Sequence, residues 1–168
     1  MFFNELLDHP EIKAAFGSRQ HHFSTELRRL KELRRRKPGQ GSVLVEPVEA
    51  AKLIISLCAC ESVNKAREAV ALYYSAGEET PTLLKLVTMA IEDGVAQFEQ
   101  LQFEGTGRAF VVWANDIGHY TTIERNTPIQ ISDGTTVPTV ERAETPAIRS
   151  IRIVEADIFE NLHNQIFH

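Results

Sequence analysis

Basic side chains gather near the start of the sequence, and their density gives them a clear chemical meaning. Residues 28–37 include seven lysines and arginines and a single acidic residue, Glu32. Guanidinium and ammonium groups packed this closely along a chain neutralise phosphates and hold the backbone of a nucleic acid. The cluster therefore predicts a polyanionic partner, and duplex DNA is the first candidate.

Ten residues are expected to form this nucleic-acid interface. The seven basic residues would contact phosphates, and two short polar side chains near the expected helix start would read bases or phosphates. Gln40 belongs to the glycine-containing loop that follows. The set is Ser24, Thr25, Arg28, Arg29, Lys31, Arg34, Arg35, Arg36, Lys37 and Gln40. A solvated helix face is the alternative interpretation of the same charges.

The charge is distributed unevenly along the chain. Residues 1–42 contain nine basic and five acidic side chains, a net charge of +4, although the whole chain carries −5. The remaining residues contain nine basic and eighteen acidic side chains and therefore carry −9. Such asymmetry is typical of a chain in which one short region meets a polyanion while the rest packs or meets other partners.

Other patterns with possible chemistry are weaker. His119 lies three residues after Asp116, but no serine or cysteine occupies a recognisable nucleophile turn. The adjacent histidines His21 and His22 have no cysteine or carboxylate partner at zinc-ligand spacing. The Gly105–Gly107 segment lacks the lysine of a phosphate loop. We therefore expect no enzymatic activity, no cofactor and no metal.

The basic cluster needs an element to position it, and the apolar pattern supplies one. Phe23, Leu27, Leu30 and Leu33 have the spacing of one helix stripe, which predicts an amphipathic helix from 22 or 23 to 36, capped by Ser24 or Thr25. Two short helices are expected before it, and a glycine loop and a strand at 43–45 after it. This order is typical of a winged helix-turn-helix, in which the third helix enters the major groove.

The rest of the chain predicts an α+β fold. Its helical N-terminal two-thirds would combine the winged helix-turn-helix-like start with a helical bundle, and a small antiparallel sheet with a C-terminal helix would follow. Expected helices span 47–58, 62–77, 80–101 and 157–166, and expected strands span 108–114, 119–124, 129–131, 135–137 and 150–154. The turn of the first hairpin is placed at 115–118. Segments 1–45, 46–104 and 105–168 are the expected divisions of the chain.

The C-terminal helix has an apolar stripe formed by Ile158, Phe159, Leu162 and Ile166. This stripe is suited either to covering the sheet or to meeting a second subunit. Because helix-turn-helix proteins gain affinity by placing two copies on neighbouring half-sites, a homodimer is expected.

The stretch from Phe23 to Val70 resembles small regulators encoded by phages and other mobile elements of bacteria. The resemblance is carried by Leu27-Arg28-Arg29-Leu30, by the loop Lys37-Pro38-Gly39-Gln40-Gly41, and by Ala50-Ala51-Lys52-Leu53. It implies DNA binding by a homodimer and control of the transcription of mobile-element genes. A non-enzymatic protein-interaction module, such as a phage-encoded inhibitor of a host defence or nucleic-acid-handling complex, is the alternative, with a host protein as partner.

The length of the apolar stretches and the positions of the two cysteines indicate where in the cell the protein is expected. The longest apolar stretch, around Leu53 to Ala59, is far shorter than the ~18 to 20 residues of a membrane span, and the first residues lack a basic leader. Cys58 and Cys60 are one residue apart in a helical stretch, so their side chains point roughly 200° apart, too awkwardly for a routine disulfide. We therefore expect a cytoplasmic protein with reduced, buried cysteines and no membrane partner.

Overall fold

Two short helices and a longer one begin the chain, in the order that the sequence predicts. They are α1 (Phe3–Leu7), α2 (Pro10–Phe16) and α3 (Arg19–Arg29). Pro10 occupies the first position of α2, and Nδ1 of His9 accepts a hydrogen bond from the backbone N–H of Glu11 at 3.3 Å. Gly17 ends this helix with φ of 64°, so only two residues separate α2 from α3.

The structure is a computed structural model that describes residues 1–34, 44–74, 81–104, 108–113, 116–121, 129–130, 134, 136–137 and 151–167. Four of the predicted interface residues, Arg35, Arg36, Lys37 and Gln40, lie outside the described residues.

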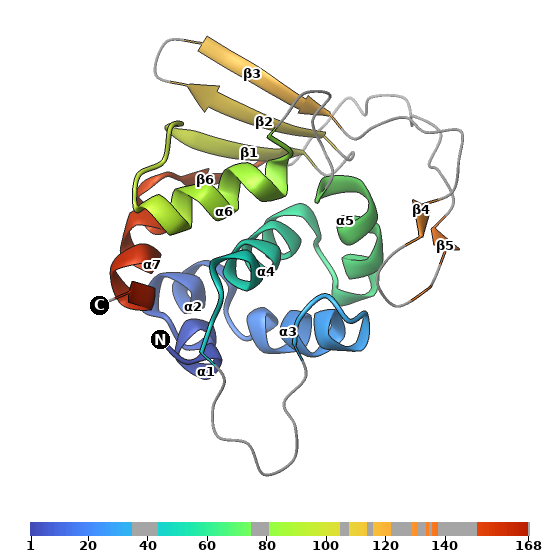
Figure 1. Cartoon of the computed structure of the whole chain (residues 1–168). Helices are drawn as coiled ribbons and strands as arrows, with labels where there is room; N and C mark the ends of the chain where they lie inside the picture. The colour runs from blue at the N-terminus through green and yellow to red at the C-terminus, as the bar shows by residue number, and fades with distance from the viewer. Residues whose placement is uncertain are drawn as a thin grey trace.

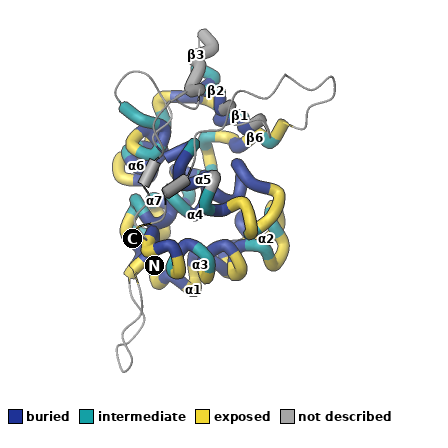
Figure 2. Tube along the Cα trace, turned by 90° about the vertical axis from the view of Figure 1, so that its right-hand side faces the viewer, coloured by how far each residue is buried: buried dark blue, intermediate teal, exposed yellow. Residues whose placement is uncertain are grey.

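α4 (Pro47–Ala59) is the central helix of the molecule, which its apolar composition predicts. Ten of its thirteen residues are buried, so the helix needs neighbours on nearly every side. Figure 1 shows α4 between α1 to α3 on one side and α6 with the sheet on the other. In Figure 2 the buried residues run through α4 and along the sides of the elements that face it.

The two helices that directly follow α4 are shorter than the sequence predicts. The short 3-10 helix η1 (Val63–Lys65) leads into α5 (Ala66–Tyr73), and α6 spans Leu83–Asp93. The prediction of one helix over 80–101 is wrong, because Gly94 adopts the left-handed conformation with φ of 67° and ends α6. His163 packs so closely against Gly94 that a Cβ at this position would lie 2.6 Å from its ring.

Four antiparallel strands form the main sheet. They are β1 (Gln100–Glu104), β2 (Arg108–Trp113), β3 (Asp116–Thr121) and β6 (Ile151–Glu155), in the order β3-β2-β1-β6. β4 (Ile129–Gln130) and β5 (Thr136–Val137) form a separate two-stranded pair, which confirms the second hairpin. Two predictions are wrong: the helix expected over 80–101 includes the first two residues of β1, and Asp116, Ile117 and Gly118 belong to β3 instead of a turn.

Alternation along β1 fixes which side of the sheet meets the helices. Leu101 and Phe103 are buried, whereas Gln100 before them and Gln102 between them are partly exposed. Phe103 meets the ring of Tyr73 from α5 at a centroid distance of 5.9 Å. The inner face of the sheet therefore closes the helical core.

α7 (Asp157–Phe167) forms as the sequence predicts, and its apolar stripe belongs to the core of the same chain. Phe159 and Leu162 are fully buried, while Ile158 and Ile166 are partly buried against the same cluster. The Phe159 ring lies 5.6 Å from that of Phe98 in an edge-to-face arrangement. Of the two interpretations of this stripe, covering the core is the one found, so the stripe gives no basis for a homodimer.

Two arginines from opposite ends of the chain satisfy carbonyl groups at the C-terminal end of α4. Arg19 in α3 donates a hydrogen bond from Nη2 to the carbonyl of Cys60, and Arg152 in β6 donates from Nη1 to that of Cys58 at 2.6 Å. These carbonyls have no partner within the helix, and cations are favoured at this negative end of the helix dipole. The α4 terminus is therefore completed by distant segments.

Neither cysteine forms a disulfide and both are buried, as predicted. Burial raises the pKa of the Cys58 thiol to about 12, and the opposing fields of Arg152 and Arg19 only partly offset this effect. At neutral pH the group is an inert thiol that fills space in the core.

One hydrophobic cluster runs through all three divisions expected from the sequence. Its members extend from Phe3 in α1, through α4, to Leu162 in α7. The helical start, the middle helices and the sheet thus share a core. Within the described residues, no helix is both long enough and apolar enough to cross a membrane.

Candidate nucleic-acid interface

The helix that carries the basic cluster starts earlier and ends earlier than predicted. α3 begins at Arg19 and ends at Arg29, so the expected helix from 22 or 23 to 36 is wrong at both ends. Its apolar stripe is confirmed, because Phe23, Leu27, Leu30 and Leu33 are all buried. The stripe holds α3 and the turn after it against α4.

A left-handed residue ends α3 in place of the usual glycine. Lys31 has φ of 65°, the N–H of Glu32 donates to the carbonyl of Leu27 at 2.8 Å, and the N–H of Lys31 donates to that of Arg28 at 3.2 Å. These two bonds are those of a Schellman motif, which turns the chain away from the helix axis. The basic residues beyond Arg29 therefore do not continue the helix.

Three basic residues lie at this end of α3. Arg28 and Arg29 occupy its last turn, and Lys31 is exposed in the turn that follows. The Arg28 guanidinium stacks over the ring of Phe3 at 4.6 Å from its centroid. Arg29 pairs with Glu26 one turn earlier, and its side chain is 57% exposed. The Glu26 side chain is 21% exposed, and such a surface pair contributes about 0 to 1 kcal/mol.

The two predicted polar readers occupy different environments. Ser24 lies in the middle of α3, is only 1% exposed and donates its hydroxyl to the carbonyl of His21 at 2.9 Å. It does not cap the helix and cannot reach a ligand, so its assignment to the interface is wrong. Thr25 is exposed, and its hydroxyl donates to the same carbonyl at 3.0 Å. Thr25 therefore remains on the available surface.

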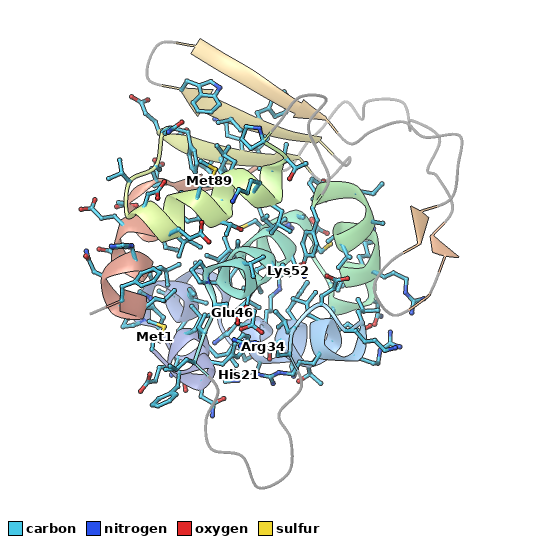
Figure 3. The ribbon with its side chains drawn as sticks, in the orientation of Figure 1. Met1, His21, Arg34, Glu46, Lys52 and Met89 are labelled. Atoms are coloured by element: carbon cyan, nitrogen blue, oxygen red, sulfur yellow. The ribbon has the colours of Figure 1, made fainter. Side chains whose placement is uncertain are left out.

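Arg34 is held by the protein itself. Its Nε and Nη2 donate to the two carboxylate oxygens of Glu49 at 3.1 and 2.6 Å, and Nη1 lies 2.7 Å from a carboxylate oxygen of Glu46. Nη2 also donates to the carbonyl of Leu44 at 2.7 Å. Figure 3 shows Arg34 and Glu46 close together beside the N-terminal end of α4. The sequence placed Arg34 among the phosphate contacts and did not identify these carboxylate partners.

The Glu49 side chain is well buried for a carboxylate, with 6% exposed. Burial alone would raise the pKa of Glu49, but hydrogen bonds from the side chain and backbone of Arg34 and from the Glu46 backbone outweigh it. The net effect is a pKa below the usual value. The carboxylate therefore stays ionised and keeps Arg34 in place at neutral pH.

Acid is expected to weaken the fold through this group. Because the pKa of Glu49 is lowered by folding, its contribution is complete above the unfolded value of about 4.3 and is lost as pH falls through the folded value. Urea unfolding measured from pH 6 down to pH 3 should show a smaller decline of the unfolding free energy for Glu49→Gln than for the wild type. Parallel declines in the two proteins would contradict this assignment.

A second ion pair lies beside the first. Nζ of Lys52 donates to the Glu32 carboxylate at 2.8 Å and to the Glu32 carbonyl at 3.1 Å, and it lies over the ring of Tyr74. The Tyr74 hydroxyl donates to the carbonyl of Lys52 at 3.1 Å and lies 2.9 Å from the hydroxyl of Ser56. Burial raises the pKa of Tyr74, so this phenol remains neutral. The network ties residue 32 to α4 and α5.

The weaker patterns from the sequence lead to no assembled site among the described residues. His21 lies 3.5 Å from Asp8 on the exposed surface, and no group of three metal-ligating side chains is found in the described part of the chain. The segment from Gly105 to Gly107 and the side chain of His119 lie outside what the structure describes. The basic residues at the end of α3 are therefore the best-supported candidate site.

Comparison with known proteins gives no relative for this chain. No family model, no curated protein and no solved structure matches it.

Proposed function

We propose that this protein binds duplex DNA through the basic cluster and acts as a transcriptional regulator of phage or mobile-element genes. The observation that carries the proposal is the position of Arg28, Arg29 and Lys31 at the end of α3. They lie on one end of a helix that the core holds rigidly, and three more basic residues follow Arg34 in the sequence. A rigid, positively charged end of this kind is suited to phosphate groups.

The mode of binding differs from that of a recognition helix. In a helix-turn-helix the first residues of the second helix meet base edges, but the basic residues here lie at the last turn of α3 and beyond. Ser24 is buried, and only Thr25 of the two expected polar readers is accessible. The proposal is therefore phosphate contact with little base readout, and it needs no second copy of the chain.

Binding to a duplex of random sequence should depend steeply on salt. If about five phosphates are neutralised, the logarithm of the binding constant should fall with that of the salt concentration at a slope of roughly −4 to −5. Between 50 and 200 mM salt this slope corresponds to a loss of about 500-fold in affinity. Fluorescence anisotropy with a labelled duplex measures both quantities.

Control variants distinguish the basic cluster from charge in general. Lys85 in α6 is exposed and distant in sequence, so Lys85→Ala should leave the slope unchanged, whereas Arg29→Ala should reduce its magnitude by about 0.9. Absence of binding at low salt, or affinity that is equal at low and high salt, would contradict DNA binding.

A protein partner is the second candidate, and the charge distribution favours it. Outside residues 1–42 the chain carries a net charge of −9, which repels a polyanion, and proteins that only hold DNA are usually basic overall. In this case the basic cluster would meet an acidic groove of a host nucleic-acid-handling complex and occupy its DNA channel. Two results together would favour this second function. The chain itself should not bind duplex DNA, and a host protein retained by the chain should be released when duplex DNA is added.

A further inference from the structure

We infer that β6 is a self-association surface, at which a second copy of this chain adds its own β6 to the edge of the sheet. The inference goes beyond DNA binding and involves no residue of the basic cluster. β6 is the last strand in the order β3-β2-β1-β6, so on one side it has no neighbouring strand among the described residues. Figure 1 shows it at the margin of the sheet, beyond β1.

The backbone of alternate residues in β6 points away from the sheet. The N–H of Ala156 donates to the carbonyl of Glu99 on the side of β1, at 2.9 Å. In an antiparallel ladder both hydrogen-bonding groups of a residue point to the same side, and that side alternates along the strand. Residues two and four positions before Ala156 therefore bond to β1. The N–H and C=O groups of Ile151, Ile153 and Glu155 point to the open edge, where no hydrogen bond joins them to the described part of the chain.

The outward-facing side chains of β6 are largely apolar. Ile151 is 50% and Ile153 is 53% exposed, although the solvent-facing side of an antiparallel sheet is usually polar. Natural edge strands are protected from pairing by proline, by bulges or by lysine. β6 contains no proline or lysine, and its five residues pair with β1 in an unbroken register. The strand therefore lacks these protective features and can accept another strand.

The sequence of β6 is complementary to itself in one antiparallel register. Only residues that point to the open edge can exchange hydrogen bonds across it, and placing Ile153 opposite Ile153 of the second copy pairs all five residues. In that register Ile151 lies opposite Glu155 of the second copy, and Arg152 lies opposite Val154. Shifting the second strand until Arg152 or Glu155 lies opposite itself brings like charges together and shortens the paired region.

This self-complementarity favours a second copy over an unrelated strand. A two-fold axis at Ile153 joins the two four-stranded sheets into one continuous sheet. The outward-pointing residues of the two strands then exchange about six hydrogen bonds, and the two Ile153 side chains pack together. Because a single strand pair is a small interface, we expect a dissociation constant on the order of 100 μM.

Ile153→Lys tests whether this edge carries the association. Sedimentation equilibrium between about 10 and 500 μM should show a monomer–dimer equilibrium for the wild type. Ile153→Lys should weaken the dimer by roughly tenfold or more, because two lysines would lie opposite each other. Undiminished association of Ile153→Lys would overturn the inference. A wild type that stays monomeric would also overturn it, and would leave the edge to a strand of another protein.

Two substitutions of Ile151 test the register and remain informative if Ile153→Lys fails to fold. Both lose the same apolar side chain, but Ile151→Lys places an opposite charge, and Ile151→Glu a like charge, across from Glu155 of the second copy. The dimer of Ile151→Lys should be tighter than that of Ile151→Glu by roughly fivefold or more. Equal association of the two variants would overturn the proposed pairing.

Lys85→Glu is the matched control for net charge. It differs from the wild type by two charges, as the two Ile151 variants differ from each other, and it lies on α6, outside the sheet. Its dissociation constant should equal that of the wild type. A loss of association as large as that between the Ile151 variants would mean that net charge governs dimerisation, which would overturn the role of β6.

Amide hydrogen exchange measured by NMR locates the contact on the backbone. The N–H of Ile153 points to the open edge, so its exchange should slow severalfold as the protein concentration rises from about 20 to 500 μM. The N–H of Val154 already bonds to β1, and its exchange should not change with concentration. Unchanged exchange at Ile153 would overturn the inference. None of these measurements involves DNA, so the proposed function is tested separately.

Discussion

Leu27→Ala is expected to lower the unfolding free energy by about 2 to 5 kcal/mol, the range for truncating a fully buried leucine. Leu27 has no exposed surface, and it lies on the stripe that holds α3 against the core. For a chain of this length each kcal/mol lowers the melting temperature by about 2 to 4 °C. Urea titration and thermal melting followed by circular dichroism measure both effects.

Arg29→Ala is the control on the same helix. Arg29 is largely exposed, and substitutions at such positions usually change stability by no more than about 0.5 kcal/mol. Its effect should appear in the binding titration instead of the melt. Unfolding caused by Arg29→Ala, or a Leu27→Ala protein as stable as the wild type, would show that the two faces of α3 have been wrongly assigned.

Lys52→Met should produce the second large effect, a loss of about 3 to 5 kcal/mol, as for other buried pairs from which one charge is removed. The Glu32 side chain is only 4% exposed and would lose its cation, whereas methionine retains most of the packing of the lysine stem against Tyr74. Chemical unfolding at neutral pH measures the loss.

A double-mutant cycle shows whether this loss arises from the unpaired charge. Replacing Glu32 by Gln in the Lys52→Met background removes that charge, so the double variant should be more stable than Lys52→Met alone. Additive effects of the two substitutions would mean that the pair contributes nothing to stability, and that Lys52 acts only through its packing.

Elements with strong local signals could be predicted from the sequence. Pro47 begins α4, and the residues that follow form a broad apolar face, so both the existence and the burial of this helix are clear. α7 follows in the same way from the apolar stripe after Asp157. These signals depend only on neighbouring residues in the chain, so they can be recognised without the structure. The α+β fold class predicted from them is confirmed.

The errors occur where a local signal was absent or was overruled. The end of α3 lacks a glycine, and the left-handed conformation falls on Lys31, a residue that rarely adopts it. Gln100–Glu104 alternates polar and apolar residues, as expected of a strand. The helical pattern of apolar residues before Gly94 nevertheless allowed one long helix to be extended as far as Leu101.

The candidate site was predictable only in its charge. Residue types and spacing reveal seven basic side chains, but they do not reveal which of them pair within the protein. Glu49 follows Arg34 by fifteen residues and meets it only because α4 packs against the turn after α3. Tertiary packing of this kind decides that Arg34 pairs with carboxylates of α4 and of the residue before it, whereas Arg29 pairs with Glu26 of its own helix.

The arginine bonds at the end of α4 have a consequence for how the chain folds during synthesis. The carbonyl of Cys58 receives its partner from Arg152, which leaves the ribosome more than ninety residues later. β6 also pairs with β1 across a long stretch of chain, and contacts so distant in sequence slow folding. The end of α4 therefore gains this hydrogen bond only after Arg152 has been synthesised, long after the N-terminal helices that pack against α4.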